Sequence, residues 1–155
     1  MNKNQTDNLL KFLQSQKVLI IASIDNKDIW ISNVYYGIDK ELNFYFSSGK
    51  DSLHSNQILN NSNVAFSVVW YDSSNYKDRK GIQGKGKCTL VTQEKEIEKA
   101  ISMHNSNFPE FKDRVTIGNI TNPEFPSKIW KIRPIFIKYW DNELFGENGT
   151  KEFNF

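Results

Sequence analysis

The sequence predicts a mostly β protein, an antiparallel barrel with short peripheral helices that forms a single domain over residues 1–155. Six segments have the β-branched, aromatic and apolar composition of strands, and turn-forming residues separate them. Only two or three short segments between them show the apolar periodicity of a helix. A chain of 155 residues can bury one hydrophobic core, and an aromatic content of 14% provides large rings to fill it.

The first third of the chain predicts a helix followed by two hairpins. Thr6 or Asp7 is expected to cap this helix, whose apolar residues fall roughly on one side. Strands are expected at residues 18–24, 29–38 and 42–46, and polar turns at residues 25–28 and 39–41 are expected to join them. Two adjacent hairpins of this kind indicate an antiparallel meander.

The rest of the chain predicts further helices and strands and one irregular segment. After a loop at 47–52, we expect a helix at 53–60, strands at 64–71 and 81–91, an amphipathic helix at 93–105, an irregular segment at 108–127 and a strand at 129–140. The glycines inside the 81–91 strand are typical of bends, bulges or the close approach of another group. Pro134 is expected to break the alternation of the last strand.

Residues 48–54 combine several features of a phosphate-binding loop. They lie between a strand and a helix, and a helix N-terminus leaves backbone N–H groups unpaired and carries a partial positive charge. Ser48 and Ser52 add hydroxyl groups, and Lys50 and His54 add side chains that can be cationic. We interpret these four residues as a candidate phosphate site. The alternative is that Ser52 only caps the helix and the other residues form a solvated loop.

The chain also carries a series of short motifs whose order and spacing are informative. They are residues 30–36, 42–48, 52–54, 61–70 and 81–86, followed by Trp130, Ile132, Arg133, Ile137, Lys138, Asp141 and Asn142. In this order they resemble pyridoxamine 5′-phosphate oxidase and its relatives, and they are most similar to an uncharacterised bacterial branch of that superfamily. The resemblance covers roughly residues 17–91 and 129–144.

This resemblance implies a six-stranded antiparallel split barrel of the FMN-binding type, which forms a homodimer and holds FMN at the subunit interface. Ser48 and Ser52 match the hydroxyl positions of the family's phosphate loop. His54 stands where the family usually has a lysine, so it would meet the phosphate best as the imidazolium. The backbone of residues 32–36 matches the strand that runs along the isoalloxazine ring. The implied cofactor-binding residues are Asn33, Val34, Tyr35, Ser48, Lys50, Ser52, His54 and Gln83.

The chain departs from the family at positions that contact the cofactor. Ser32 stands where the family has an arginine that grips the FMN phosphate, and Leu53 and His54 replace an Arg-Lys pair. The glutamine that contacts the flavin from the long strand falls on Gly81, although Gln83 is nearby.

The absence of two of the family's basic side chains is expected to lower the affinity for FMN, because a charge-assisted hydrogen bond contributes about 1.5–3 kcal/mol. FMN affinity is therefore expected to be ~100-fold weaker than in the family, unless Lys50, Lys80 or Lys85 substitutes. The C-terminal Trp and Arg-x-His signature that holds pyridoxal phosphate is absent, so pyridoxamine-phosphate oxidase activity is not expected.

These features predict an FMN-binding flavoprotein, an oxidoreductase that acts on a small molecule that the sequence does not identify. No residue is assigned a catalytic role. One alternative is a non-enzymatic flavin-binding or sensor dimer with weak FMN affinity. Another is a split barrel that uses a different cofactor, a deazaflavin or haem.

Composition argues against several other classes. The formal net charge of +2 and the acidic residue within the basic stretch 77–87 do not favour nucleic-acid binding. No apolar run approaches the roughly 18 residues that a membrane span needs, and the polar N-terminus lacks a signal-peptide core, so a cytoplasmic protein is expected. His54 and His104 have no further ligand at metal-binding spacing, so no metal site is expected. His104 and Cys88 are interpreted as packed core residues.

Overall fold

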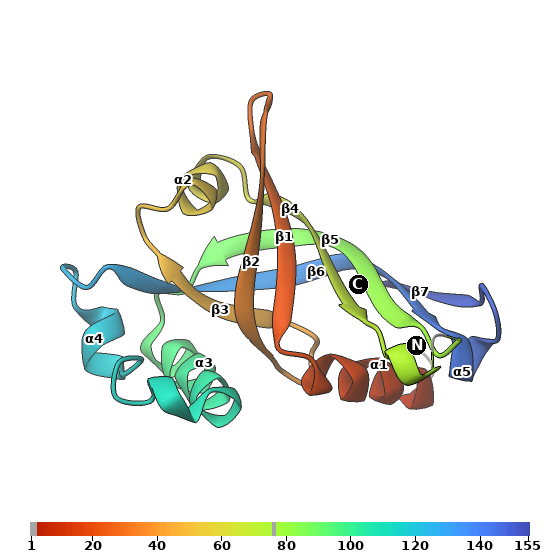
Figure 1. Cartoon of the computed structure of the whole chain (residues 1–155). Coiled ribbons are helices and arrows are strands. Elements are labelled where there is room, and N and C mark those ends of the chain that lie inside the picture. Colours follow the sequence, from red (N-terminus) through yellow and green to blue (C-terminus); the bar gives the residue numbers. More distant parts are fainter. Residues whose placement is uncertain (1–2, 76) are drawn as a thin grey trace.

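The computed structural model describes residues 3–75 and 77–155, which form a seven-stranded antiparallel sheet closed into a barrel (Figure 1). The strands are β1 (Val18–Asp25), β2 (Asp28–Ile38), β3 (Phe44–Gly49), β4 (Asn63–Trp70), β5 (Lys80–Leu90), β6 (Ser127–Asp141) and β7 (Thr150–Asn154). The helices are α1 (Lys3–Ser15), α2 (Leu53–Asn60), α3 (Glu94–Asn107), α4 (Ile117–Thr121) and α5 (Asn142–Phe145). None of the described helices has the length and apolar character needed to cross a bilayer.

Strand β6 closes the barrel. One of its edges pairs with β5 along nearly its whole length, while the other edge pairs first with β3 and then with β7. The strand order is β3-β2-β1-β4-β5-β6-β7, and the additional β3–β6 pairing joins the two ends of the first six strands. The barrel therefore has the six antiparallel strands that the sequence predicts, and β7 extends the sheet beyond the point of closure.

The core fills the barrel because alternate strand residues point inward. The inward-facing set is Leu19, Ile21, Val34, Tyr36, Phe44, Phe46, Val64, Phe66, Val68, Ile82, Cys88, Trp130, Ile132, Ile137 and Tyr139. Each large side chain of this kind contributes about 1.5–3 kcal/mol by leaving water. Cys88 is among the buried residues, as expected, and burial raises the pKa of its thiol to about 12.

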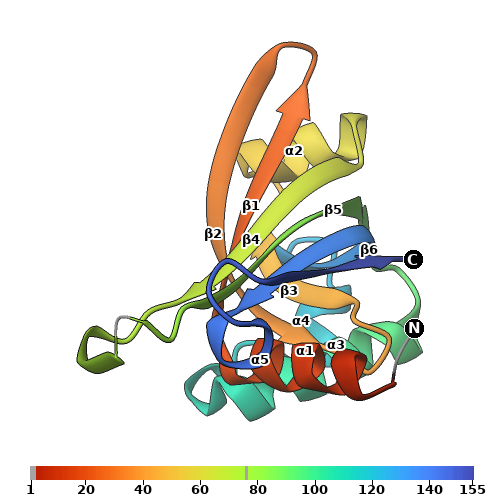
Figure 2. The same cartoon turned by 90° about the vertical axis from the view of Figure 1, so that its right-hand side faces the viewer.

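Helix α1 covers one end of the barrel (Figure 2). Its buried side, formed by Leu9, Phe12 and Leu13, packs into the core, and the Tyr36 hydroxyl donates a hydrogen bond of 2.6 Å to the Leu13 carbonyl. Helices α3 and α4 cover a second, smaller core on another side of the barrel. That core consists of Tyr45, Val91, Ile97, Ala100, Val115, Ile120 and Ile129.

Strands β1 and β2 continue past the barrel as a projecting two-stranded arm, and α2 lies beside it (Figure 1). The Ser23 hydroxyl on β1 donates a hydrogen bond of 2.7 Å to the Gln57 side chain on α2, and both residues are buried. The opposite side of the arm stays open, and Ile29 and Ile31 of β2 are 65% and 63% exposed.

Several predicted boundaries were wrong. Helix α1 already includes Lys3, so neither Thr6 nor Asp7 caps it. Leu42 does not begin a strand, because its backbone is left-handed (φ 63°) and β3 runs instead from Phe44 through Gly49. Ser48 is therefore a strand residue paired with β6 rather than part of a loop.

The C-terminal third differs most from the prediction. Segment 108–127 is not irregular throughout, since it contains α4 and a 3₁₀ turn at Pro109–Phe111. Strand β6 runs through Pro134 without a break, and the register with β5 shifts opposite it, between Lys85 and Gly86. Strand β7 and helix α5 were not predicted from the sequence.

Gly81 shows why a glycine is needed inside β5. The Trp140 indole lies across it, and a Cβ at position 81 would come within 2.3 Å of Cζ2 of that ring. We expect Gly81→Ala to lower the free energy of unfolding by about 1–3 kcal/mol through overpacking. Urea denaturation followed by circular dichroism measures this change.

Gly118 is the matched control, because a Cβ there meets nothing within 4 Å. Gly118→Ala should leave stability unchanged or raise it slightly, since it lies within α4. Equal effects at the two glycines would contradict the packing argument.

Candidate cofactor site

The N-terminus of α2 is built by serines that follow the end of β3. Ser52 is the N-cap residue, with extended backbone angles, and its hydroxyl accepts a hydrogen bond from the Ser55 backbone N–H. The Ser52 N–H donates to the Gly49 carbonyl at 3.2 Å, and the Ser55 hydroxyl donates to the same carbonyl at 2.7 Å. These bonds attach the first turn of α2 to the end of β3.

His54 lies at the centre of this region and is bonded through both ring nitrogens. Ser32 Oγ on β2 lies 3.0 Å from Nδ1, and Ser48 Oγ on β3 lies 2.7 Å from Nε2. Ser52 Oγ lies 3.2 Å from Nε2 and 3.3 Å from Nδ1. In the neutral imidazole one nitrogen donates and the other accepts, so either tautomer can be satisfied by serine hydroxyls. We call Ser32, Ser48, Ser52 and His54 the serine–histidine cluster.

The cluster is uncharged at neutral pH. His54 is only 9% exposed, and burial lowers the pKa of its imidazole below the ordinary value of 6.5. The ring is therefore neutral in the unliganded chain, and the prediction that His54 meets a phosphate as the imidazolium applies only when a bound anion favours its protonated form.

Lys50 is the nearest cation in the sequence, but it is directed away from the cluster. Its ammonium donates to the Pro123 carbonyl at 3.0 Å, and its backbone N–H donates to the Pro126 carbonyl at 2.7 Å. Of the four residues predicted for the phosphate, the structure brings together Ser48, Ser52 and His54 and ties Lys50 to the loop before β6.

The residues predicted for the flavin ring divide between two sides of β2. Val34 is buried in the barrel core, whereas Asn33 and Tyr35 are exposed on the outside. A ligand on the outer surface can therefore meet the side chains of Asn33 and Tyr35 but only the backbone of Val34. Ser32 shares the inward side with Val34, which is how it reaches His54.

Gln83 lies on the same outer surface as Asn33. Asn33 pairs with Ile20 on β1, Ile20 with Ser67 on β4, and Ser67 with Gln83 on β5, so the four residues form one row across three strand spacings, about 14 Å. We call this surface the outer face. It consists of Ile29, Ile31, Asn33, Tyr35, Val18, Ile20, Ala22, Ala65, Ser67, Val69, Gln83 and Lys85.

Gln83 also lines a groove of about 310 Å³ next to Trp140. The indole of Trp140 forms a flat wall there because Gly81 beneath it has no side chain. Arg79 and Lys138 give this groove a positive character. Ser32 was noted in the sequence only as the replacement for a family arginine, and its bond to His54 was not predicted. Strand alternation places both Ser32 and Trp140 on the sides where they are found.

The serine–histidine cluster and Gln83 face opposite sides of the barrel wall, because Ser32 points inward to His54 and Gln83 points outward in the row that includes Asn33. Ser48 pairs with Lys128 near the start of β6, whereas Gln83 pairs with Lys138 near its end. Ten residues of β6 separate these pairs along the strand, whereas the row from Asn33, the neighbour of Ser32, to Gln83 spans only about 14 Å across the sheet.

The remaining polar candidates have structural partners. His104 is buried against Phe108 and Phe111, in agreement with its interpretation as a packed residue. Asp78, Asp141 and Glu143 gather within 4.8 Å of one another, an arrangement that the sequence reading missed. The Lys80 ammonium lies within 4.0 Å of all three carboxylates and supplies the positive charge there.

Comparisons with known proteins agree with this architecture. A family model described as pyridoxamine 5′-phosphate oxidase matches residues 5–141. A UPF0306 protein of Campylobacter jejuni is 24% identical over 139 residues, which covers 89% of this chain and 90% of that protein. A UPF0306 protein of Yersinia pseudotuberculosis is 26% identical over 145 residues, with 91% and 90% covered.

Solved structures share the fold at low sequence identity. A heme binding protein from Mycobacterium smegmatis has a TM-score of 0.76 at 13% identity; 99% of this chain is covered, but only 59% of that longer protein. A putative pyridoxamine 5′-phosphate oxidase from Listeria innocua has a TM-score of 0.67 at 19% identity, covering 87% and 97%. The heme storage protein HutZ from Vibrio cholerae has a TM-score of 0.65 at 16% identity, covering 83% and 88%.

Burial of His54 predicts a pH dependence of stability. Because its pKa is lower in the folded chain than in the unfolded one, the unfolded chain binds the proton more readily. Stability from this residue is therefore fully present above about pH 6.5 and is lost as the pH falls below that value. We expect His54→Asn, which keeps hydrogen-bonding groups without titrating, to reduce the fall in stability between about pH 7.5 and 5.5. Urea unfolding at several pH values measures it, and equal slopes in the two proteins would refute the assignment.

Proposed function

The chain belongs to the pyridoxamine 5′-phosphate oxidase family, and on this basis we propose that it binds FMN in a site shared by two copies of the chain. The observation that carries the proposal is the convergence of Ser48, Ser52 and His54 at the N-terminus of α2. Bound FMN would supply redox chemistry toward a small-molecule substrate. The protein would bind and orient the flavin, and no side chain is assigned a catalytic role.

The serine–histidine cluster suits a phosphate group in part. Its hydroxyls are donors that can turn from the imidazole to an oxyanion, and the first turn of α2 adds backbone N–H groups and a partial positive charge. A dianion would also favour the protonated form of His54. The cluster has no fixed cation, however, so binding is expected to be weak unless Lys50 leaves the Pro123 carbonyl.

The flavin ring would lie on the outer face. The β2 backbone at Asn33 and Tyr35 is accessible there, and the groove beside Gln83 offers an amide and the Trp140 indole. Since Gln83 and Ser48 face opposite sides of the barrel wall in one chain, the proposal assigns this contact to Gln83 of a partner subunit.

The outer face is also the surface proposed to form the homodimer. It exposes large apolar side chains on adjacent strands, among them Ile29, Ile31, Tyr35 and Val69. Contiguous apolar surface of this kind is rare on monomers and marks interaction sites. A twofold axis would place two copies of this face against each other, and a stable dimer would bury more than ~1,000 Å² in total.

Haem is the second candidate cofactor, because solved structures of the same fold are described as a heme binding protein and a heme storage protein. His54 is a poor iron ligand as it stands, since both of its nitrogens are engaged by serines. The absorption spectrum of the purified protein separates the readings. A flavin spectrum supports the FMN proposal and a Soret band supports haem. A colourless dimer that does not take up added FMN rejects flavin binding.

Variants at the serine–histidine cluster test the phosphate assignment. We expect Ser48→Ala to weaken FMN binding by about 3- to 10-fold and His54→Lys, which introduces a fixed cation, to strengthen it by ~10-fold. Quenching of FMN fluorescence on titration measures both. The control is Ser73→Ala, an exposed serine in a 3₁₀ turn, which should bind like the wild type. Equal affinity in all four proteins would leave Ser52 as a helix cap only.

A charge on the outer face tests the dimer. Ile31→Glu should give a monomer at micromolar concentration, because a buried carboxylate without a partner is costly. Leu59→Glu on α2 is the matched control, since Leu59 is 62% exposed but lies off the outer face. Light scattering after size exclusion reports the mass. A wild-type monomer, or an Ile31→Glu dimer, would defeat this interface.

A further inference from the structure

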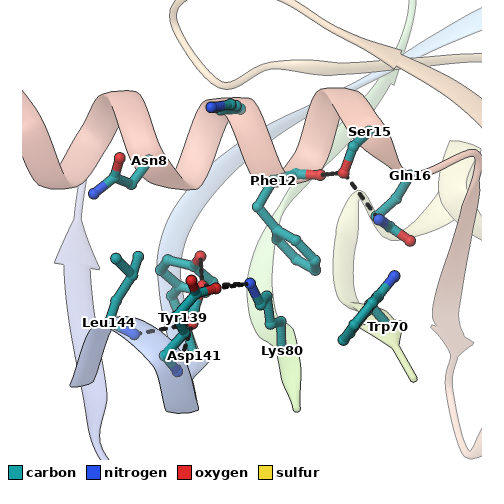
Figure 3. A pocket seen from close by; sticks show the side chains of 11 residues that line it. Asn8, Phe12, Ser15, Gln16, Trp70, Lys80, Tyr139, Asp141 and Leu144 are labelled. Atoms are coloured by element: carbon teal, nitrogen blue, oxygen red, sulfur yellow. Dashed lines mark hydrogen bonds and ion pairs between the residues drawn. The ribbon is translucent and has the colours of Figure 1, made fainter. Parts of the chain in front are cut away.

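A cavity of about 360 Å³ lies between α1 and the end of the barrel that it covers (Figure 3). Its roof is the side of α1 that carries Asn8 and Phe12, together with Gln16 just after the helix. Its floor is formed by the end of β4, the start of β5 and the end of β6. Tyr139 and Asp141 contribute from β6, eleven or more residues beyond the strand position that pairs with Ser48. The cavity is therefore separate from the serine–histidine cluster.

Aromatic rings form much of the cavity wall. Phe12 points from α1 toward Lys80 and Trp70 in Figure 3, and its ring stacks on Tyr139 with centroids 5.6 Å apart. Trp70 faces it from the end of β4, and Leu144 of α5 adds an aliphatic side chain. A volume of this size and an aromatic wall are usual in sites for small organic molecules.

The cavity already holds an ammonium group, that of Lys80. This group lies 5.7 Å from the centroid of the Trp70 ring and 2.6 Å from Glu143 Oε2. Asp78 and Asp141 lie 3.5 and 4.0 Å from it. A ring face combined with carboxylates is the arrangement by which proteins recognise organic ammonium ions.

Charge at the floor is not balanced by Lys80 alone. Two carboxylates of the lining, Asp141 and Glu143, and the neighbouring Asp78 surround one ammonium, and Asp78 Oδ1 has only the 3.5 Å ion pair with Lys80 as its partner among the described residues. Glu143 directs one oxygen to Lys80, and its side chain is mostly exposed to the cavity mouth and solvent. Lys11 is the other cation of the lining, and it lies across the cavity on α1. The floor therefore favours a second positive charge.

We propose that this cavity binds an organic ammonium ion with an apolar, aromatic body, its charge beside Glu143 and its ring between Phe12 and Trp70. The amides of Asn8 and Gln16 on the roof offer polar contacts at the two ends of the cavity. The site is independent of the proposed cofactor site.

Three indole probes of similar size and different charge test the proposal: tryptamine, 3-methylindole and indole-3-propionate. Tryptamine should bind in isothermal titration calorimetry at least about fivefold more tightly than the neutral probe, and the anion should bind weakest. Quenching of Trp70 is avoided as a readout because the probes fluoresce; chemical shifts of α1 amides locate the binding instead.

Two variants separate the charge argument from simple apolar binding. Glu143→Gln should weaken tryptamine by about 3- to 10-fold and leave 3-methylindole unchanged, whereas Glu147→Gln, an exposed acid outside this cavity, should change neither. Lys80→Met should strengthen tryptamine binding, because it removes the resident ammonium while the carboxylates remain.

The opposite ranking of the probes, or tighter binding of the anion that Lys80→Met abolishes, would overturn the proposal in favour of an anion site. Equal binding of all three probes would show an apolar cavity without charge selection and would also overturn it. Because Lys80→Met leaves buried carboxylates unpaired, its fold is checked by thermal unfolding, and Glu143→Gln decides the question if that variant is unstable.

Discussion

The two-sided pairing of β6 is the constraint on which the rest of the structure depends. Its first half closes the barrel against β3 and its second half pairs with β7, so the positions of Ser48 and of the residues beside β7 are set by the same strand. Ser48 is fixed at one end by its pairing with Lys128, and Gln83 at the other by its pairing with Lys138. Because Ser48 faces inward and Gln83 faces outward from the barrel wall, we propose that a cofactor that contacts both lies between two chains.

Side chains alternate between the two sides of β2, and this alternation separates the residues predicted for the cofactor into two groups. Ser32 and Val34 point inward, and Asn33 and Tyr35 point outward. Ser32 thereby becomes part of a partly buried hydrogen-bond network with His54. The serine hydroxyls satisfy both nitrogens of the neutral imidazole, so the network is stable without a charge. It contains no fixed cation, which is the group that would bind a phosphate strongly.

Local sequence signals predicted the strands of the barrel, helix α2 and the proximity of Ser48, Ser52 and His54. These depend on alternation and on capping by Ser52, which act over a few residues. Helix α4 and strand β7 were not predicted, because each is short and is stabilised mainly by contacts with β6 or the second core. Pro134 was misjudged for a related reason: β6 accepts it where the register with β5 shifts, and that shift depends on the partner strand.

The central claim, that one cofactor site uses Ser48 of one subunit and Gln83 of its partner, can be tested with mixed dimers. Ser48→Ala and Gln83→Ala chains are prepared separately, then unfolded, mixed in equal amounts and refolded, and FMN binding is titrated. Each variant alone should bind FMN poorly, but random pairing should restore about one site in four to wild-type affinity, because a mixed dimer contains one intact shared site. A mixture that binds no better than the two variants measured separately would contradict a shared site.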